Sequence, residues 1–244
     1  MTTPAGCGEI GAMSIPRLRI ATYNLQKCIG MDLQRRPDRS LQVINALKAD
    51  IVVLQEADKR LPPRPAALPH RMIKEHGWRI LSFGAPGGSL GWHGNAMLVS
   101  ASVTVMKLGH IDLPGLEPRG AIFADVKTAI GEVRVVGLHL GLLRYFRLLQ
   151  VAAILRYLQQ LSPTSTILAG DFNEWGSGKD LDAIAKGVTF IKSPASFPSL
   201  RPIARLDRFA LPPDLTALGT DVHTVQPARI ASDHLPVWVE VTRV

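Results

Sequence analysis

The pattern of apolar and polar positions along the chain predicts a protein rich in short strands. Eight segments are β-branched or aliphatic and are bounded by Gly, Pro or Asp, which is typical of strands. The last of them alternates between apolar and polar residues, whereas others are apolar throughout, as expected for a sheet covered on both faces. The predicted strands span residues 18–24, 50–56, 95–100, 121–127, 133–140, 165–171, 205–211 and 236–242.

Two further segments have the apolar periodicity of helices. In residues 36–50, Pro37 stands where a first-turn proline belongs, and residues 144–161 predict a longer helix. A third, short helix is expected within residues 179–186. Strands alternate with a helix at first and then dominate, and this order favours an α/β domain built on mixed sheets. The apolar stripe predicted for the long helix consists of Tyr145, Leu148, Leu149, Ala152, Leu155 and Leu158.

The domain organisation follows from length and from the absence of linkers. No internal repeat or linker divides the 244 residues, so we expect one domain over residues 17–244 after a flexible tail at residues 1–16. Residues 60–70 form a proline-rich loop. The glycines of residues 83–95 lack the spacing of the common phosphate-binding loops, and this segment is interpreted as a flexible rim.

The composition limits the kinds of binding partner and the cellular compartment expected for this protein. The net charge of +8 is compatible with a polyanionic partner, either nucleic acid or an anionic membrane surface, although solubility alone also explains it. No window approaches the roughly 18 apolar residues of a membrane span, and the first residues do not resemble a secretory signal. Cys7 and Cys28 match neither a disulfide framework nor a zinc pattern, which predicts reduced thiols and a cytoplasmic protein.

Polar side chains recur where the predicted strands end. Glu56 is the most unusual, because a carboxylate that directly follows Ile-Val-Val-Leu must reach either solvent or a cation. Each residue alone has an ordinary explanation, such as a turn, a helix cap, a satisfied core histidine or an ion pair of Asp207 with Arg205 or Arg208. The recurrence at so many strand ends favours a common site. The candidates are Asn24, Glu56, His139, Asp171, Asn173, Asp207, Asp233 and His234.

These segments resemble the motifs of the endonuclease/exonuclease/phosphatase superfamily, in that family's order over residues 22–236. Each motif is weak alone, whereas the ordered set is highly specific, and the chain is most similar to the small bacterial members. The matching segments are "TYN" with Asn24, "LQE" with Glu56, "GNAML" with Asn95, "HLGL" with His139, "GDFN" with Asp171 and Asn173, "RLD" with Asp207, and "SDHLP" with Asp233 and His234.

The resemblance implies a DNase I-like four-layer α/β sandwich, with two mixed sheets, helices on the outer faces and the active site at one edge between the sheets. It also implies divalent-metal-dependent hydrolysis of phosphate esters, usually phosphodiesters. The residues agree, since four converging carboxylates in a basic protein need a cation or protons to coexist. Oxygen ligands without cysteine favour Mg²⁺, with Mn²⁺ as a substitute.

Roles are assigned from the chemistry of each side chain and from its match to the motifs. Glu56 is the expected principal metal ligand, with Asn24 beside it and Asp233 bound directly or through water. His234 is the expected general base, or an electrostatic partner of the phosphate, and Asp207 would hold its other ring nitrogen.

The remaining candidates are expected to contact water or substrate. Asp171 would orient the attacking water or protonate the departing oxygen, while Asn173 and His139 would donate hydrogen bonds to the phosphoryl group. Arg119 matches a phosphate-contacting position of nuclease members, and Asn95 is placed with it as a substrate-binding or supporting residue. Arg147 and Gln150 are interpreted as structural.

Nucleic acid is the expected substrate, because the motif set and the net positive charge both indicate a phosphodiester backbone. The alternative is a lipid or small-molecule phosphoesterase. Trp92, Tyr145 and Phe146 would then offer apolar contacts, although core packing explains the latter two, and no long apolar hairpin is evident. A non-catalytic scaffold is a third alternative, which the intact motif set disfavours. No obligate protein partner is evident.

Overall fold

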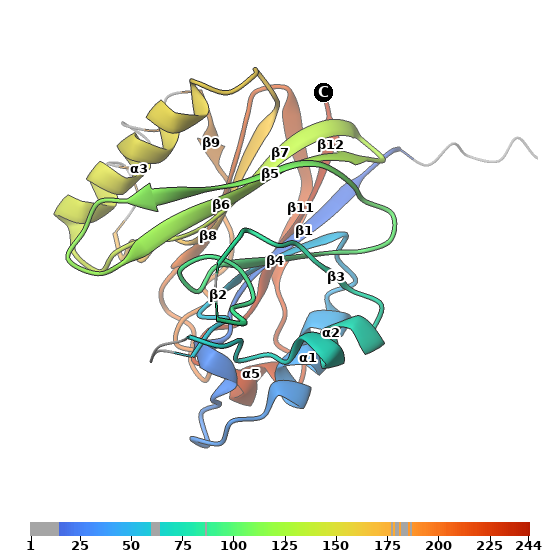
Figure 1. Cartoon of the computed structure of the whole chain (residues 1–244), viewed down its shortest axis with the longest axis vertical. Helices are drawn as coiled ribbons and strands as arrows, with labels where there is room; N and C mark the ends of the chain where they lie inside the picture. The colour runs from blue at the N-terminus through green and yellow to red at the C-terminus, as the bar shows by residue number, and fades with distance from the viewer. Residues whose placement is uncertain are drawn as a thin grey trace, which may run out of the picture.

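The computed structural model describes residues 15–59, 64–85, 87–176, 178, 181, 185 and 187–244. Residues 1–14 of the expected tail and most of the short helix expected within 179–186 therefore lie outside the described residues. Within the described ranges, the chain forms two six-stranded sheets with few helices (Figure 1).

The first sheet has the strand order β11-β12-β1-β2-β4-β3. Its central pair, β1 and β2, is parallel, and its other neighbouring strands are antiparallel, so the sheet is mixed. The bounds are β1 Leu18–Asn24, β2 Ile51–Gln55, β3 Arg79–Ile80, β4 Ala96–Val99, β11 Leu215–Val222 and β12 Val237–Arg243.

The second sheet has the strand order β5-β6-β7-β8-β10-β9 and is mixed in the same way. Its parallel pair is β7 with β8, and the remaining pairs are antiparallel. The bounds are β5 Thr104–Leu113, β6 Arg119–Thr128, β7 Gly131–His139, β8 Thr166–Asp171, β9 Thr189–Phe190 and β10 Asp207–Leu211.

The main core lies between the two sheets. Val53 of β2 packs there with Ile122 and Phe209 of the second sheet, and all three side chains are buried. The sheets approach so closely that a Cβ atom on Gly137 would lie only 2.7 Å from Val53 Cγ1. A glycine at this position of β7 is therefore required by packing.

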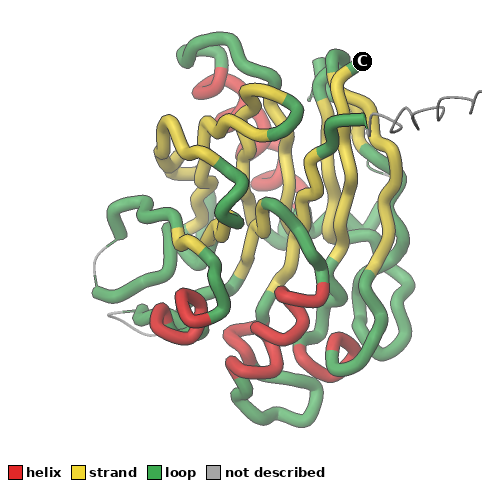
Figure 2. Tube along the Cα trace, turned by 90° about the vertical axis from the view of Figure 1, so that its right-hand side faces the viewer, coloured by secondary structure: helices red, strands yellow, loops and turns green. Residues whose placement is uncertain are grey.

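Helices cover the outer faces. Apolar residues of α1 (Pro37–Ala46), α2 (His70–Glu75) and α5 (Ala228–Ala231) pack on the first sheet, and α3 (Arg144–Leu158) packs on the second. Figures 1 and 2 place the three short helices together at the lower end, and α3 lies in the upper half. The expected four-layer α/β sandwich of two mixed sheets is confirmed.

The sequence pattern missed the four edge strands β3, β5, β9 and β11 and misjudged the buried face of α3. Strands β5 and β11 are largely half-buried or exposed, and therefore lack the apolar run that identified the central strands. On α3, Tyr145 is 68% exposed and Leu149 is 39% exposed, so the predicted stripe is wrong at both positions, as is the expected core packing of Tyr145.

The buried side of α3 includes two polar residues. Gln150 donates a hydrogen bond to Pro114 O (2.9 Å) and accepts one from the backbone N–H of Gly141 (2.8 Å), while Arg147 pairs with Glu174 at 3.1 Å. These bonds satisfy the buried polar groups that a periodicity argument would place in solvent. The structural role expected for Arg147 and Gln150 is confirmed.

Candidate active site

Strand pairing in the first sheet brings the first two candidate residues together. Because β1 and β2 are parallel with Asn24 opposite Gln55, Asn24 and the following Glu56 leave the sheet at the same edge. Glu56 has a left-handed backbone (φ 50°), which turns the chain immediately after the buried strand. Its side chain therefore reaches the cavity at the strand end and avoids the core.

The second sheet delivers the other group by the same geometry. His139 at the end of β7 is opposite Asp171 of the parallel β8, and Asp171 is opposite Asp207 of the antiparallel β10. Gly170 permits the approach of these strands, since a Cβ atom there would lie 2.0 Å from Leu138 O. The glycine before Asp171 is thus part of the construction of the site.

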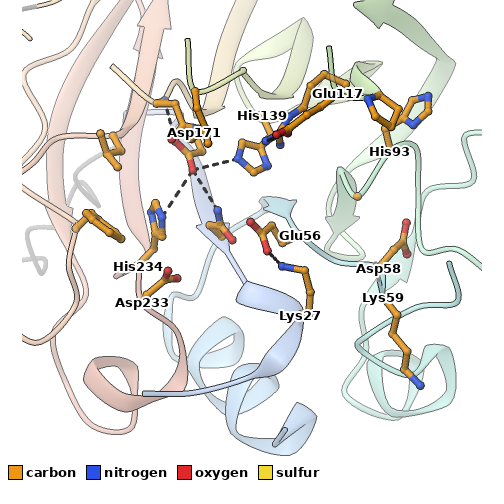
Figure 3. A pocket seen from close by; sticks show the side chains of 18 of the residues that line it. Lys27, Glu56, Asp58, Lys59, His93, Glu117, His139, Asp171, Asp233 and His234 are labelled. Atoms are coloured by element: carbon orange, nitrogen blue, oxygen red, sulfur yellow. Dashed lines mark hydrogen bonds and ion pairs between the residues drawn. The ribbon is translucent and has the colours of Figure 1, made fainter. Parts of the chain in front are cut away.

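A cavity of about 680 Å³ opens where these strand ends meet. That volume lies within the range of roughly 300–1,000 Å³ that is usual for ligand pockets. The cavity holds most of the predicted site residues on its walls (Figure 3). Those that line it are Asn24, Glu56, Arg119, His139, Asp171, Asn173, Asp233 and His234.

Two predicted site residues lie outside the lining. Asp207 is fully buried behind His234, which it contacts directly. Asn95 is 1% exposed, and its side-chain N–H donates to Gly120 O at 2.8 Å. This bond ties the segment before β4 to β6 of the other sheet, so the geometry gives Asn95 a supporting position behind the wall and no direct contact with the cavity.

Asp171 is the centre of the buried polar network. Its Oδ2 atom accepts a hydrogen bond from Asn24 Nδ2 at 3.1 Å and lies 3.5 Å from His139 Nε2 and 3.7 Å from His234 Nε2 (Figure 3). Its other oxygen accepts from the backbone N–H of Asn173 at 2.9 Å. One carboxylate therefore joins both sheets and faces both histidines.

The surroundings of the two histidines shift their pKa values in opposite directions. Burial lowers the pKa of His234, but the adjacent Asp207, reinforced by Asp171 and Asp233, outweighs burial and raises the pKa to about 10. Burial lowers the pKa of His139 to about 3, and the attraction of Asp171 only partly opposes it. His234 therefore carries a proton at neutral pH and His139 is neutral.

A short turn after β1 connects the expected metal ligands. Residues Gln26–Cys28 have φ angles of 45°, 59° and 59°, so three consecutive non-glycine residues adopt the left-handed conformation. This conformation is unfavourable for non-glycine residues and is usually retained for a functional reason. Here it places the ammonium group of Lys27 on the carboxylate of Glu56 (Figure 3).

The same turn also reaches Asn24 and Asp233. The backbone N–H of Gln26 donates to Asn24 Oδ1 at 3.1 Å, and its side-chain oxygen accepts from the backbone N–H of Asp233 at 3.1 Å. Burial raises the pKa of Asp233, and the nearby Glu56 carboxylate adds to that rise against the opposing His234. The turn therefore holds three oxygen-bearing side chains around one side of the cavity.

The donor set fits a hard cation. Among the described residues, Asp171, Asp207 and His234 offer ligand atoms within 4.8 Å of one another. Oδ1 of Asp207 is buried without a hydrogen-bond partner. On the other side, Glu56 and Asp233 are like-charged neighbours, an arrangement that a cation stabilises. Two adjoining groups of residues can thus accommodate a metal ion of the oxygen-preferring class.

Several residues of the site were missed by sequence reasoning. Lys27 lies within the motif around Asn24, but nothing in the pattern indicated that its side chain reaches Glu56. Trp175 follows "GDFNE" directly and is 61% exposed at the cavity. Its ring lies 5.6 Å from Phe197, whose own ring lies 4.8 Å from the imidazole of His234. Proximity to the motifs was the only available signal.

Comparison with family models gives one decisive match. The model of the Endonuclease/Exonuclease/phosphatase family matches residues 21–234, which is most of the chain and includes every candidate residue above. The chain belongs to this family. Comparison with curated protein sequences finds no match. As a member of a family of phosphoesterases, it is expected to hydrolyse a phosphate ester.

Solved structures share the fold of this chain at low sequence identity. A protein of unknown function from Enterococcus faecalis has a TM-score of 0.74 at 21% identity, over 93% of this chain and 100% of that one. TDP2 from D. rerio, in complex with a single-strand DNA product, has a TM-score of 0.72 at 17% identity (93% and 99% covered). A mannosyl-6-phosphatase from Bacteroides thetaiotaomicron has a TM-score of 0.70 at 19% identity (92% and 99% covered).

Proposed function

We propose that the protein is a divalent-metal-dependent phosphodiesterase that hydrolyses its substrate by attack of water. The observation that carries the proposal is the position of Asp171, which contacts Asn24 and lies within 3.7 Å of both His139 and His234 in one cavity. A buried carboxylate between a neutral and a protonated imidazole is suited to orient water beside a phosphate. Family membership supports phosphoester hydrolysis as the reaction class.

The metal would be held by Glu56, Asn24 and Asp233. Mg²⁺ is the proposed ion, with Mn²⁺ as a substitute, because the donors are oxygens and the described residues that line the cavity include no thiolate. When bound, such an ion polarises the phosphate and neutralises its developing charge. For Glu56 to bind it, the ammonium group of Lys27 must leave the carboxylate on which it lies in this structure.

His234 is proposed to act on the phosphate through Nε2. Its Nδ1 atom is occupied by Asp207 at 2.9 Å, which leaves Nε2 as the ring atom directed toward Asp171 and the cavity. In its protonated form it donates a hydrogen bond to a phosphate oxygen, the electrostatic role anticipated above. Asn173 Nδ2 donates one hydrogen to Leu140 O at 2.9 Å, so its other amide hydrogen and the neutral His139 would supply further donors.

Nucleic acid is the first proposed substrate class. Lys59, Arg64 and Arg119 line the cavity, and basic residues of this kind contact phosphate backbones without reading sequence. A structural relative, D. rerio TDP2, was crystallised with a single-strand DNA product, which supports this choice. The reducing cytoplasm is the proposed compartment, since Cys28 is buried as a free thiol.

A lipid phosphodiester is the second candidate, and a specific observation favours it. Large apolar side chains are exposed immediately beside the cavity, at Leu116, Leu142 and Leu143. Leu142 lines the cavity itself. A nucleic-acid site has little use for aliphatic side chains at this position, because protein–nucleic-acid interfaces are polar and positively charged.

The test is a substrate panel with and without Mg²⁺. Single-stranded and duplex DNA, RNA, bis-p-nitrophenyl phosphate and phospholipid vesicles are each incubated with the wild type, Glu56→Gln and His234→Ala. We expect metal-dependent cleavage of a phosphodiester that falls by about 10²-fold or more in both variants. Glu132→Gln and His76→Ala, at exposed positions, are the matched controls. Cleavage that survives EDTA, or that both site variants retain, would refute the proposal.

A further inference from the structure

Four large apolar side chains stand exposed on two segments beside the cavity. Leu116, in the turn between β5 and β6, is 82% exposed, and Leu142, Leu143 and Tyr145 at the start of α3 are 65%, 57% and 68% exposed. We call these four residues the apolar rim. Leu116, Leu142 and Leu143 line one small cavity of about 160 Å³, so the two segments adjoin each other, and Tyr145 lies two positions after Leu143. Contiguous apolar exposure of this kind indicates an interaction surface.

The rim is held in place by buried polar side chains. Gln150, 1% exposed, binds both segments, through Pro114 O before Leu116 and through the backbone N–H of Gly141. Arg147, 5% exposed, donates to the carbonyl oxygen of Leu142. These hydrogen bonds fix the backbone of both segments, so the fold itself holds the leucine side chains in solvent.

The rim and the candidate active site share a wall. Glu117, Arg119 and Leu142 line both the small apolar cavity and the large cavity of the site. Whatever the rim contacts is therefore adjacent to the phosphate that the site would receive. A ligand suited to both regions combines a phosphodiester with an aliphatic part.

The charge of the protein indicates which kind of partner the apolar rim contacts. The net charge is +8. At the boundary between the rim and the site, Arg119 is paired with Glu117 at 2.8 Å, so the attraction to an anionic layer comes from the overall charge of the protein. Basic residues near an anionic bilayer add electrostatic attraction, and inserted aliphatic side chains add the hydrophobic part of the binding energy. An anionic lipid layer would bury the exposed leucines and attract the positive charge of the protein, whereas nucleic acid would only attract the charge.

We propose that the apolar rim is a membrane-contact surface that inserts into an anionic lipid layer. The candidate active site then acts on a phosphodiester presented from that layer, a second step that rests on the proposed function. The long apolar hairpin missing from the sequence is replaced by two segments, a hairpin turn with Leu116 and the start of α3. No helix among the described residues is long and apolar enough to cross a membrane. The proposed contact is therefore peripheral.

Vesicle co-sedimentation tests the surface without requiring catalysis. Wild-type protein should bind phosphatidylcholine vesicles that contain phosphatidylglycerol more tightly than pure phosphatidylcholine, and Leu116→Ser/Leu143→Ser should weaken binding at least tenfold. Neither leucine lines the large cavity, so hydrolysis of soluble bis-p-nitrophenyl phosphate should be unchanged. Leu33→Ser/Leu218→Ser, at other exposed positions (87% and 49%), is the matched control and should bind like the wild type.

Three outcomes would overturn the inference. Absence of vesicle binding by the wild type refutes it directly, and equal binding by the rim variant assigns the contact to another surface. A self-association in analytical ultracentrifugation that the rim variant abolishes would assign the rim to a second copy of the chain. Loss of bis-p-nitrophenyl phosphate hydrolysis in Glu56→Gln is scored separately, so the proposed function and the membrane surface succeed or fail independently.

Discussion

His234 Nδ1 lies 2.9 Å from Asp207 Oδ2, and both side chains are buried at the wall of the cavity. Asp207 is held in turn by the hydroxyl of Ser196, which donates to the same oxygen. The carboxylate thus orients the imidazole and stabilises its protonated form. This pair offers a direct test of the site, because Asp207 contacts His234 and does not itself line the cavity.

Asp207→Asn should lower the pKa of His234, since the charge and hydrogen bond that raise it are removed. An NMR titration should then place the pKa of the His234 imidazole well below the value of about 10 expected for the wild type. Phosphodiesterase activity should fall by about 10²–10⁴-fold. Asp214→Asn, at an exposed ion pair with Arg243, should leave both readouts unchanged. An unshifted His234 resonance would show that Asp207 does not control it.

Lys27→Gln should strengthen divalent-metal binding. The ammonium group occupies the Glu56 carboxylate, so a metal ion has to displace it and then tolerate its charge nearby. Removing about 1.4 kcal/mol of that competition would raise Mn²⁺ affinity roughly tenfold. Mn²⁺ binding followed by electron paramagnetic resonance measures the change independently of turnover. Weaker binding in the variant would instead mean that Lys27 supports the metal-binding conformation of the turn.

Cys28 should be unreactive in the folded protein. It is fully buried, and burial raises the pKa of its thiol to about 11. In a Cys7→Ser background, iodoacetamide at pH 8 should label Cys28 only after unfolding. Rapid labelling of the native protein would contradict the buried position.

The same thiol makes stability fall at alkaline pH. The unfolded chain releases the proton near pH 8.5, whereas the folded chain keeps it until about 11. Between these values the unfolded state binds fewer protons, so the free energy of unfolding should decrease by about 1.4 kcal/mol per pH unit. Urea unfolding from pH 8.5 to 9.5 measures the slope, and Cys28→Ala should reduce it.

Asp125→Ala should destabilise the fold without altering the site chemistry. Arg134 is 2% exposed and donates to both oxygens of Asp125, at 2.6 Å and 2.9 Å. Removing the carboxylate leaves a buried charge unpaired, which costs about 3–5 kcal/mol in urea unfolding. The exposed pair of Arg36 and Asp38 provides the comparison, and Asp38→Ala should cost less than about 1 kcal/mol. Equal effects would mean that burial of the pair is unimportant.

Much of the site could be predicted because its residues leave central strands. The buried strands before Asn24, Glu56 and Asp171 have unmistakable apolar runs, so their polar ends stand out in the sequence. The edge strands β5 and β11 could not be found in this way, since an edge strand buries few of its side chains. Periodicity also misjudged α3, where Gln150 is buried by hydrogen bonds that no pattern of apolar residues reveals.

The sequence by itself determined the family, the mixed α/β character and the residues that carry the chemistry, because these depend on local runs and on ordered motifs. Only the tertiary structure decided which atoms meet. The pairing of Lys27 with Glu56 depends on a left-handed turn, and the contact of Asp171 with both histidines depends on the packing of two sheets. The apolar rim arises in the same way, since Leu116 and Leu143 are joined by the burial of Gln150 and not by their spacing along the chain.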